Sequence, residues 1–140
     1  GFPLSGTAMR PELVQEFGEK ARYFNTFGGN PVAAAAGMAV LDVIADEGLQ
    51  DNATAVGGFL KSGLQDIATR YSEIGHVRGA GLFLAVECVT VRQNGVLISA
   101  TRPGANVLKI RPPLVLQQAE ATLFLEATEA AFAAARAEGV

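Results

Sequence analysis

The chain has 140 residues, enough for one domain with a hydrophobic core, and 49% of them are hydrophobic. Its 11 basic and 14 acidic residues give a net charge of −3 at pH 7, and no basic run is present, which argues against a nucleic-acid partner. The single cysteine, Cys88, excludes an internal disulfide and indicates a reducing compartment, and a chain with one cysteine and one histidine offers no metal site.

The first 30 residues show few signs of a packed unit. Residues 1–11 contain several glycines and prolines without periodicity, so we expect a loop or an extended arm there. Residues 11–17 carry acidic side chains early in a possible short helix, as the helix dipole favours. We expect residues 1–30 to lie against structure that this chain does not contain.

Residues 24–31 (FNTFGGNP) are typical of a loop that meets an anion. The two glycines allow close backbone approach, Asn30 is a suitable N-cap, and Pro31 fits the first turn of the next helix. The free N–H groups of a helix start favour a phosphate or carboxylate, and the Thr26 hydroxyl can add a hydrogen bond. The residues alone leave open whether this loop binds an anion or is an ordinary capped junction.

Apolar periodicity predicts two helices, at residues 31–47 and 49–71. The first is rich in alanine, so another backbone can pack closely against it, and Gly48 is suited to end it. In the second, Gly57 and Gly58 either weaken the helix or permit close packing. Its expected apolar face consists of Val56, Phe59, Leu60, Leu64, Ile67 and Tyr71.

Strands are expected from residue 82 onward, because the glycines between residues 75 and 81 interrupt any earlier pattern. The predicted strands are residues 82–89, 96–99 and 107–111, the last stopped by two prolines. A final helix is predicted from residue 117 or 118 to about Arg136. Its expected inward residues are Leu123, Phe124, Ala127, Ala131 and Phe132. This order of elements predicts an α+β fold, a small antiparallel sheet covered by helices.

Four segments resemble landmarks of the class III pyridoxal-phosphate aminotransferases, and they occur in the family's order. They are residues 23–31 (YFNTFGGNP), 41–44 (LDVI), 77–83 (VRGAGLF) and 109–114 (KIRPPL). The resemblance covers nearly the whole chain and corresponds to the C-terminal third of such an enzyme. It implies the C-terminal domain of a fold-type I pyridoxal-phosphate enzyme at residues 31–140, preceded by an arm and phosphate-loop segment of the large domain at residues 1–30.

The family's cofactor contacts carry over to the loop described above. The resemblance implies that Thr26 hydrogen-bonds the phosphate of pyridoxal phosphate across a dimer interface, with Asn25 as the second candidate. It also implies that the lysine joined to the cofactor lies a few residues before the segment resembling Gly1. Lys20, Lys61 and Lys109 do not match that motif, so no catalytic residue is assigned.

Two cations near residue 110 are candidates for binding the substrate. Many family members carry an arginine at the position of Lys109, where it grips a carboxylate through a two-pronged contact that lysine cannot reproduce. Arg111, two residues further on, shares the face of an extended strand and could supply that contact. Alternatively the substrate's anionic group is a phosphate, which lysine binds well, as in the phospholyases of this family.

The chain departs from the family between its first two predicted strands, where a loop and a helix are usual. Either an internal deletion or a skipped stretch would explain this. Asn94–Gly95 is a hairpin signal at this point, and the predicted hairpin would be an artefact in the second case.

The sequence therefore predicts a truncated class III aminotransferase that transfers an amino group between an amine or amino acid and a keto acid. Without its lysine we expect it to be inactive alone, and a homo-oligomer and a cytoplasmic location are expected. A non-catalytic oligomerisation or regulatory module and a remnant of a phospholyase acting on amino-alkyl phosphates are the alternatives. No membrane partner is expected, because the longest apolar stretch, residues 32–43, is too short for a bilayer and contains Asp42.

Overall fold

The computed structural model describes residues 2–88, 100–101 and 106–137. It forms two compact units, residues 1–47 and 48–140. The expected division after residue 30 concerns the domains of a parent enzyme and stays a prediction. No helix in the described ranges is long and apolar enough to cross a membrane.

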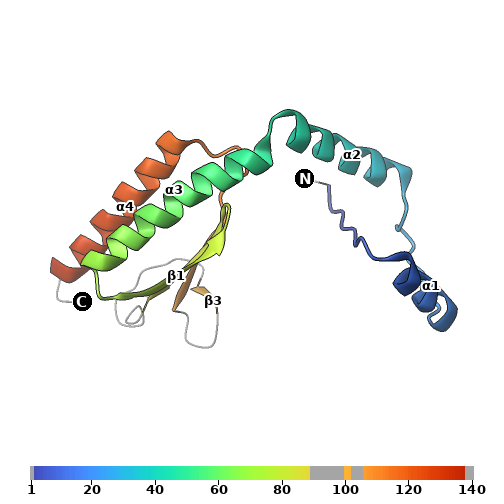
Figure 1. Ribbon diagram of the computed structural model, residues 1–140, viewed down its shortest axis with the longest axis horizontal. Coiled ribbons are helices and arrows are strands. Elements are labelled where there is room, and N and C mark those ends of the chain that lie inside the picture. The colour runs from blue at the N-terminus through green and yellow to red at the C-terminus, as the bar shows by residue number, and fades with distance from the viewer. Residues whose placement is uncertain (1, 89–99, 102–105, 138–140) are drawn as a thin grey trace. The chain divides into compact units, whose positions relative to one another are not determined.

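The first unit contains helices α1 (Pro11–Lys20) and α2 (Pro31–Asp46), joined by the glycine-rich loop (Figure 1). α2 begins as expected, because the Asn30 side chain accepts hydrogen bonds from the N–H groups of Val32 (2.9 Å) and Ala33 (3.2 Å). Most side chains of this unit are exposed, which agrees with the expectation that residues 1–30 pack poorly on their own.

The extended arm of the first unit packs on α2 through one small residue. The Leu4 side chain occupies the space that a Cβ at Gly37 would need. A larger residue at Gly37 would therefore require the end of the Leu4 side chain to move.

The second unit contains a four-stranded antiparallel sheet. Its strands are β1 (Ile74–Ala80), β2 (Phe83–Cys88), β3 (Ala100–Thr101) and β4 (Val107–Ile110), in the spatial order β1-β2-β4-β3. Helices α3 (Leu49–Arg70) and α4 (Gln118–Ala137) lie side by side over one face of this sheet (Figure 1). The predicted α+β architecture is confirmed.

The hydrophobic core lies between α3, α4 and the sheet. The expected face of α3 is confirmed: Leu60, Leu64 and Ile67 are at most 2% exposed. From β2 the core receives Leu84, Val86 and Cys88, which alternate along the strand as its period of two requires. Burial raises the pKa of the Cys88 thiol to about 11, so this cysteine is a core residue and not a nucleophile.

Three glycines allow the backbones of this unit to approach closely. A Cβ at Gly57 would collide with the backbone of Gly81, so α3 rests directly on the turn between β1 and β2. Gly79 has a φ of +134°, which side-chain-bearing residues rarely adopt, and a Cβ there would meet the backbone of Phe83. Lys61 on α3 donates a hydrogen bond to the Gly79 carbonyl oxygen (3.0 Å) and ties the helix to this turn.

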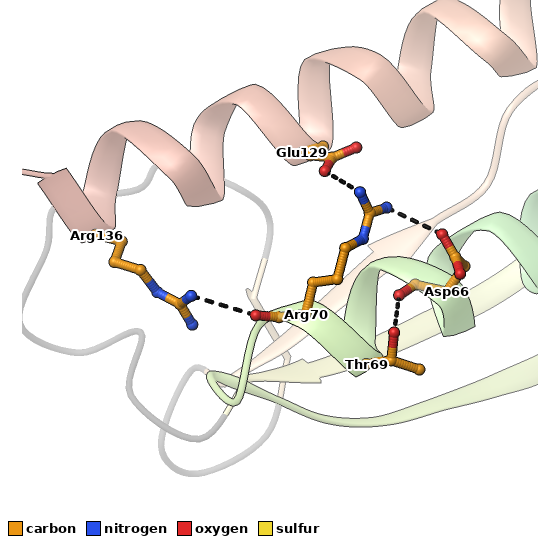
Figure 2. Close-up of polar contacts among 5 residues, drawn as sticks. All are labelled: Asp66, Thr69, Arg70, Glu129 and Arg136. Atoms are coloured by element: carbon orange, nitrogen blue, oxygen red, sulfur yellow. Dashed lines mark hydrogen bonds and ion pairs between the residues drawn. The ribbon is translucent and has the colours of Figure 1, made fainter.

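Polar contacts join the C-terminal end of α3 to α4 (Figure 2). Arg70 forms ion pairs with Asp66 on its own helix (3.0 Å) and with Glu129 on α4. Arg136 donates a hydrogen bond to the Arg70 carbonyl oxygen (3.2 Å) and pairs with Glu73 (2.9 Å). Its guanidinium lies over the Tyr71 ring, 4.9 Å from the centroid.

Two expectations about this unit were wrong. Strand β1 was not predicted, because its glycines suggested an interruption of the strand pattern. Gly79 is in fact required near the end of β1, because its φ of +134° is rarely adopted by other residues. The inward face of α4 was also misplaced: Leu123 is 64% exposed and Phe124 is 38% exposed. Both Ala127 and Ala131 are exposed too, whereas Ala121, Leu125 and the correctly predicted Phe132 pack inward. α4 is so rich in alanine that hydrophobicity alone did not identify the packed side.

The strand expected at residues 107–111 ends at Ile110, one residue early. The strand expected at residues 96–99 and the hairpin at Asn94–Gly95 lie outside the described residues.

Candidate cofactor and substrate residues

The glycine-rich loop is held in shape by the Asn25 side chain. Its Oδ1 atom accepts hydrogen bonds from the N–H groups of Phe27 (3.1 Å) and Gly28 (3.1 Å), and its Nδ2 atom donates to the Tyr23 hydroxyl (3.2 Å). This is an Asx turn, in which a short amide side chain mimics backbone hydrogen bonding. The side-chain oxygen of Asn25 is therefore occupied by backbone hydrogen bonds that fix the loop around Thr26.

Thr26 occupies the second position of this turn and is exposed. In the described part of the chain, neither its hydroxyl nor its backbone N–H makes a hydrogen bond, and the same holds for the N–H of Gly29. Gly29 has a φ of +70° and open space where a Cβ would lie. These unpaired donors on a turn that an anion can approach closely fit a phosphate group.

The first backbone N–H groups of helix α2 are already hydrogen-bonded, although the sequence predicted that they would be free for an anion. The Asn30 cap already satisfies the N–H groups of Val32 and Ala33, and the Asn30 carbonyl oxygen accepts from Ala34 (2.9 Å). In this segment the free backbone donors are therefore those of the loop around Thr26 and not those of Val32, Ala33 and Ala34.

Lys109 and Arg111 are in the second unit, on and just beyond strand β4. Lys109 is half-buried and lies within the strand, whereas Arg111 is exposed and follows its last residue, Ile110. Lys109 pairs in register with Ala85 of β2. Within the described residues its side chain makes no ion pair or hydrogen bond, so its ammonium group is available to an anion.

Asn52 on α3 positions the segment that follows Arg111, a role that no local sequence pattern indicates. Its Nδ2 atom donates to the carbonyl oxygens of Leu114 (2.7 Å) and Leu116 (3.1 Å). These bonds span more than 60 residues of sequence. Only the folded arrangement brings the two segments together.

Arg78 on β1 forms an ion pair with a carboxylate of the neighbouring strand. Its Nη1 atom lies 2.8 Å from Glu87 Oε2 on the neighbouring strand. His76 is exposed on β1. Among the described residues, no group of histidine, cysteine, aspartate and glutamate side chains could hold a metal ion.

Comparison with known proteins gives a consistent result. The family model described as "Aminotransferase class-III" matches residues 1–132. An ethanolamine-phosphate phospho-lyase homolog of Caenorhabditis elegans is 36% identical over 84% of this chain. An alanine–glyoxylate aminotransferase 2 homolog of Arabidopsis thaliana, named as mitochondrial, is 38% identical over 92% of it. The chain spans 29% and 31% of these two relatives, about a third of their length.

Solved structures agree with this result. A phospholyase from Arthrobacter in complex with phosphoethanolamine superposes with a TM-score of 0.76 and 38% identity, over 88% of this chain and 33% of the other. A PLP-bound amine transaminase from an uncultivated Pseudomonas species gives a TM-score of 0.70 and 36% identity, over 85% of this chain and 31% of the other. The fold is that of the fold-type I pyridoxal-phosphate enzymes.

Proposed function

Because the chain belongs to the class III aminotransferase family, we propose that it supplies the phosphate-binding loop and a substrate-binding strand of a pyridoxal-phosphate enzyme. The reaction proposed is transfer of an amino group between an amine or amino acid and a keto acid. The observation that carries the proposal is the exposed Thr26, with unpaired donors in a loop held by Asn25. When bound, the cofactor supplies an electron sink for the substrate's reacting carbon.

Each part of the loop has a defined task in this proposal. The Thr26 hydroxyl and the N–H groups of Thr26 and Gly29 donate hydrogen bonds to phosphate oxygens. Asn25 keeps these donors in place through its two bonds to the backbone, and Gly29 leaves room for the anion. We propose that this loop serves the site of a partner subunit in a homodimer and that the protein acts in the cytoplasm.

We propose that the lysine that anchors the cofactor is not among residues 1–140 and that these residues are inactive alone. Two of the three lysines among residues 1–140 already have polar partners. Lys20 forms an ion pair with Glu16 (2.5 Å), and Lys61 donates to the Gly79 carbonyl oxygen (3.0 Å). Lys109, the third, is assigned to the substrate's anion together with Arg111.

Elimination of phosphate from an amino-alkyl phosphate is the second candidate reaction. It is favoured by a lysine at residue 109, since an ammonium group suits phosphate whereas a guanidinium is the better partner for a carboxylate. A relative and a solved structure that resemble this chain also carry the name phospholyase.

The cofactor role is tested with Thr26→Val in the whole protein that carries these residues. Removing one hydrogen bond to a charged group weakens binding by about 1.5–3 kcal/mol, so the Kd for pyridoxal phosphate should rise roughly 10- to 100-fold. Thr26→Ser keeps the hydroxyl and is the matched control, expected near the wild-type value. An unchanged Kd in Thr26→Val would contradict the assignment.

Whether residues 1–140 alone attach the cofactor covalently is tested by adding pyridoxal phosphate, reducing with borohydride and measuring the protein mass. No stoichiometric adduct at a defined lysine is expected. An adduct that forms at one lysine and disappears when that lysine is replaced would show that this segment anchors the cofactor itself.

The two reactions are separated by assaying the whole protein with phosphoethanolamine and with simple amino acids. Phosphate release from the first, weakened in Lys109→Met through a higher KM, would support the phospholyase. Amino transfer from the second, with no phosphate release, would support the aminotransferase and exclude the second candidate.

A further inference from the structure

Residues 111–117 connect β4 to α4 and belong to neither element. This connecting segment begins with Arg111, which the proposed function assigns to the substrate's anion. Two prolines follow Arg111 directly, so only three residues separate Ile110, the last residue of β4, from Leu114. The contacts that attach this segment to the rest of the unit therefore bear on where the Arg111 side chain lies.

Asn52 attaches the far end of the connecting segment to α3. Its Nδ2 atom donates hydrogen bonds to the carbonyl oxygens of Leu114 (2.7 Å) and Leu116 (3.1 Å). The Leu116 N–H donates in turn to the Pro113 carbonyl oxygen (3.0 Å), and the Leu116 side chain packs against the hydrophobic core. Asn52 itself is partly buried near the start of α3, where its N–H donates to the Gly48 carbonyl oxygen (3.1 Å). The attachment is therefore a hydrogen-bonded turn fixed to a helix.

The stretch between this turn and β4 has little conformational freedom. Each proline holds its φ at about −65°, and a residue that precedes a proline is confined to extended conformations. The second restriction applies to both Arg111 and Pro112. At the other end, Ile110 pairs in register with Leu84 of β2. Because stiff residues join two attached ends, a displacement at Leu114 moves the backbone of Arg111 as well.

The Arg111 side chain depends on its backbone for its direction. It is exposed, and among the described residues its guanidinium makes no ion pair or hydrogen bond that would orient it. A guanidinium binds an anion best through two parallel hydrogen bonds, a contact that requires alignment of a planar group. Anion binding at Arg111 is therefore sensitive to small changes in the backbone that carries it.

We infer that Asn52 is a positioning residue, which holds the Leu114 end of the connecting segment on α3 and so keeps Arg111 in the orientation that binds the substrate's anion. The inference rests on the proposed function, which assigns Arg111 to that anion. Asn52 acts only through the backbone of the segment, by means of its two hydrogen bonds to carbonyl oxygens.

The first arm of the test measures backbone order at residue 111 without substrate. Nitroxide labels are placed at Arg111→Cys, Val115→Cys or Gln65→Cys in the whole protein, from which other reactive cysteines have been removed. Buried Cys88 stays in place, because its raised pKa of about 11 keeps it unreactive. Asn52→Ala should shift the electron paramagnetic resonance spectra at residues 111 and 115 toward the mobile component. The label at Gln65, exposed on α3, should not change.

Thr54→Val is the matched control on the same helix. The Thr54 hydroxyl donates to the Gln50 carbonyl oxygen (2.9 Å), so this variant loses a hydrogen bond that does not involve the connecting segment. The label at residue 111 should keep its wild-type spectrum in Thr54→Val. If Asn52→Ala does not fold, as judged by circular dichroism, Asn52→Ser replaces it. Its hydroxyl donates to only one of the two carbonyl oxygens, and a smaller shift in the same direction is expected.

The second arm measures steady-state kinetics of the whole protein with an anionic amino substrate. Asn52→Ala should raise the KM roughly 2- to 10-fold, the range that one ordinary hydrogen bond represents, with little change in kcat. In an Arg111→Met background the same substitution should have no further effect on the KM, because the group that it positions is absent. A merely structural role of Asn52 would give equal losses in both backgrounds.

The inference is overturned if the label at residue 111 keeps its wild-type spectrum in folded Asn52→Ala. A shift at residue 115 alone would mean that Asn52 orders only its own turn. Equal increases in KM with and without Arg111 would also overturn it. Failure of the proposed function gives a different pattern: the label at residue 111 shifts as expected, but Arg111→Met leaves the KM unchanged. That pattern overturns the assignment of Arg111 to the substrate and supports the control of its backbone by Asn52.

Discussion

Gly57 on α3 lies directly against the backbone of Gly81 in the turn between β1 and β2, with no space for a Cβ at Gly57. The next residue, Gly58, is exposed and has nothing within 4 Å of such an atom. Two adjacent glycines in one helix therefore have opposite structural roles, which provides a matched pair of substitutions.

Gly57→Ala should destabilise the second unit. Forcing a methyl group into closely packed backbone typically costs about 1–3 kcal/mol. Gly58→Ala should instead stabilise it by about 0.5–1 kcal/mol, because alanine is the better helix former and meets no obstacle. Urea unfolding of the two variants measures both effects, and equal changes in the two would contradict the close contact with Gly81.

The sequence identified what local patterns determine, and α3 is the example. Its apolar spacing predicted the buried side correctly. The predictions that failed depended on contacts between residues far apart in the sequence. Gly79 at the end of β1 and Gly81 in the turn that follows allow close backbone approach, to Phe83 and to Gly57 respectively, which only the folded structure reveals.

The candidate site shows the same limit. The cap at Asn30 was predicted from residue type, but that the cap occupies the helix donors and leaves those of Thr26 free required the hydrogen-bond geometry. The ion pair of Glu87 with Arg78 depends on strand register, which a single sequence does not specify. The contacts of Asn52 with Leu114 and Leu116 depend on the tertiary fold in the same way.

The pair between Glu73 and Arg136 should make stability depend on acidic pH. The hydrogen bond from Arg136 is the main cause that lowers the pKa of Glu73 below 4.5, and a lowered pKa means that the pair stabilises the fold above the unfolded-state value. That contribution is lost as the pH falls through the folded-state pKa.

Glu73→Gln should accordingly have a lower Tm than wild type at neutral pH, and the difference should shrink on acidification below 4.5. Glu126→Gln, an exposed position on α4, is the control for loss of one surface charge. A Tm difference that persists unchanged into strong acid would show that the effect does not come from the ionised carboxylate.

Cys88 should limit stability at alkaline pH. Burial raises its pKa from 9.0 to about 11, so the folded state keeps the thiol proton more tightly than the unfolded state. Its contribution is complete below the unfolded pKa and is lost as the pH rises toward the folded one. A shift of two units corresponds to about 2.7 kcal/mol.

The free energy of unfolding should therefore fall between pH 9 and 11 by up to this amount more in the wild type than in Cys88→Ala. Tyrosine and lysine titrations are common to both proteins, so the difference isolates the thiol. Cys88→Ala is expected to be less stable at neutral pH because it leaves a small cavity. Parallel pH profiles would show that thiol ionisation does not contribute.

Lys109→Arg and Arg111→Lys, made in the whole protein, should distinguish which cation binds the substrate. A guanidinium at residue 109 can grip a carboxylate with two parallel hydrogen bonds, which an ammonium cannot. If Lys109 is the contact, Lys109→Arg should lower the KM for a carboxylate-bearing substrate by about tenfold, the equivalent of one added hydrogen bond, while a phosphorylated amine changes less. If Arg111 supplies the fork instead, Arg111→Lys should raise the carboxylate KM and Lys109→Arg should have little effect. Steady-state kinetics with both substrates decides between them, and a KM unaffected by either exchange would remove both residues from the substrate site.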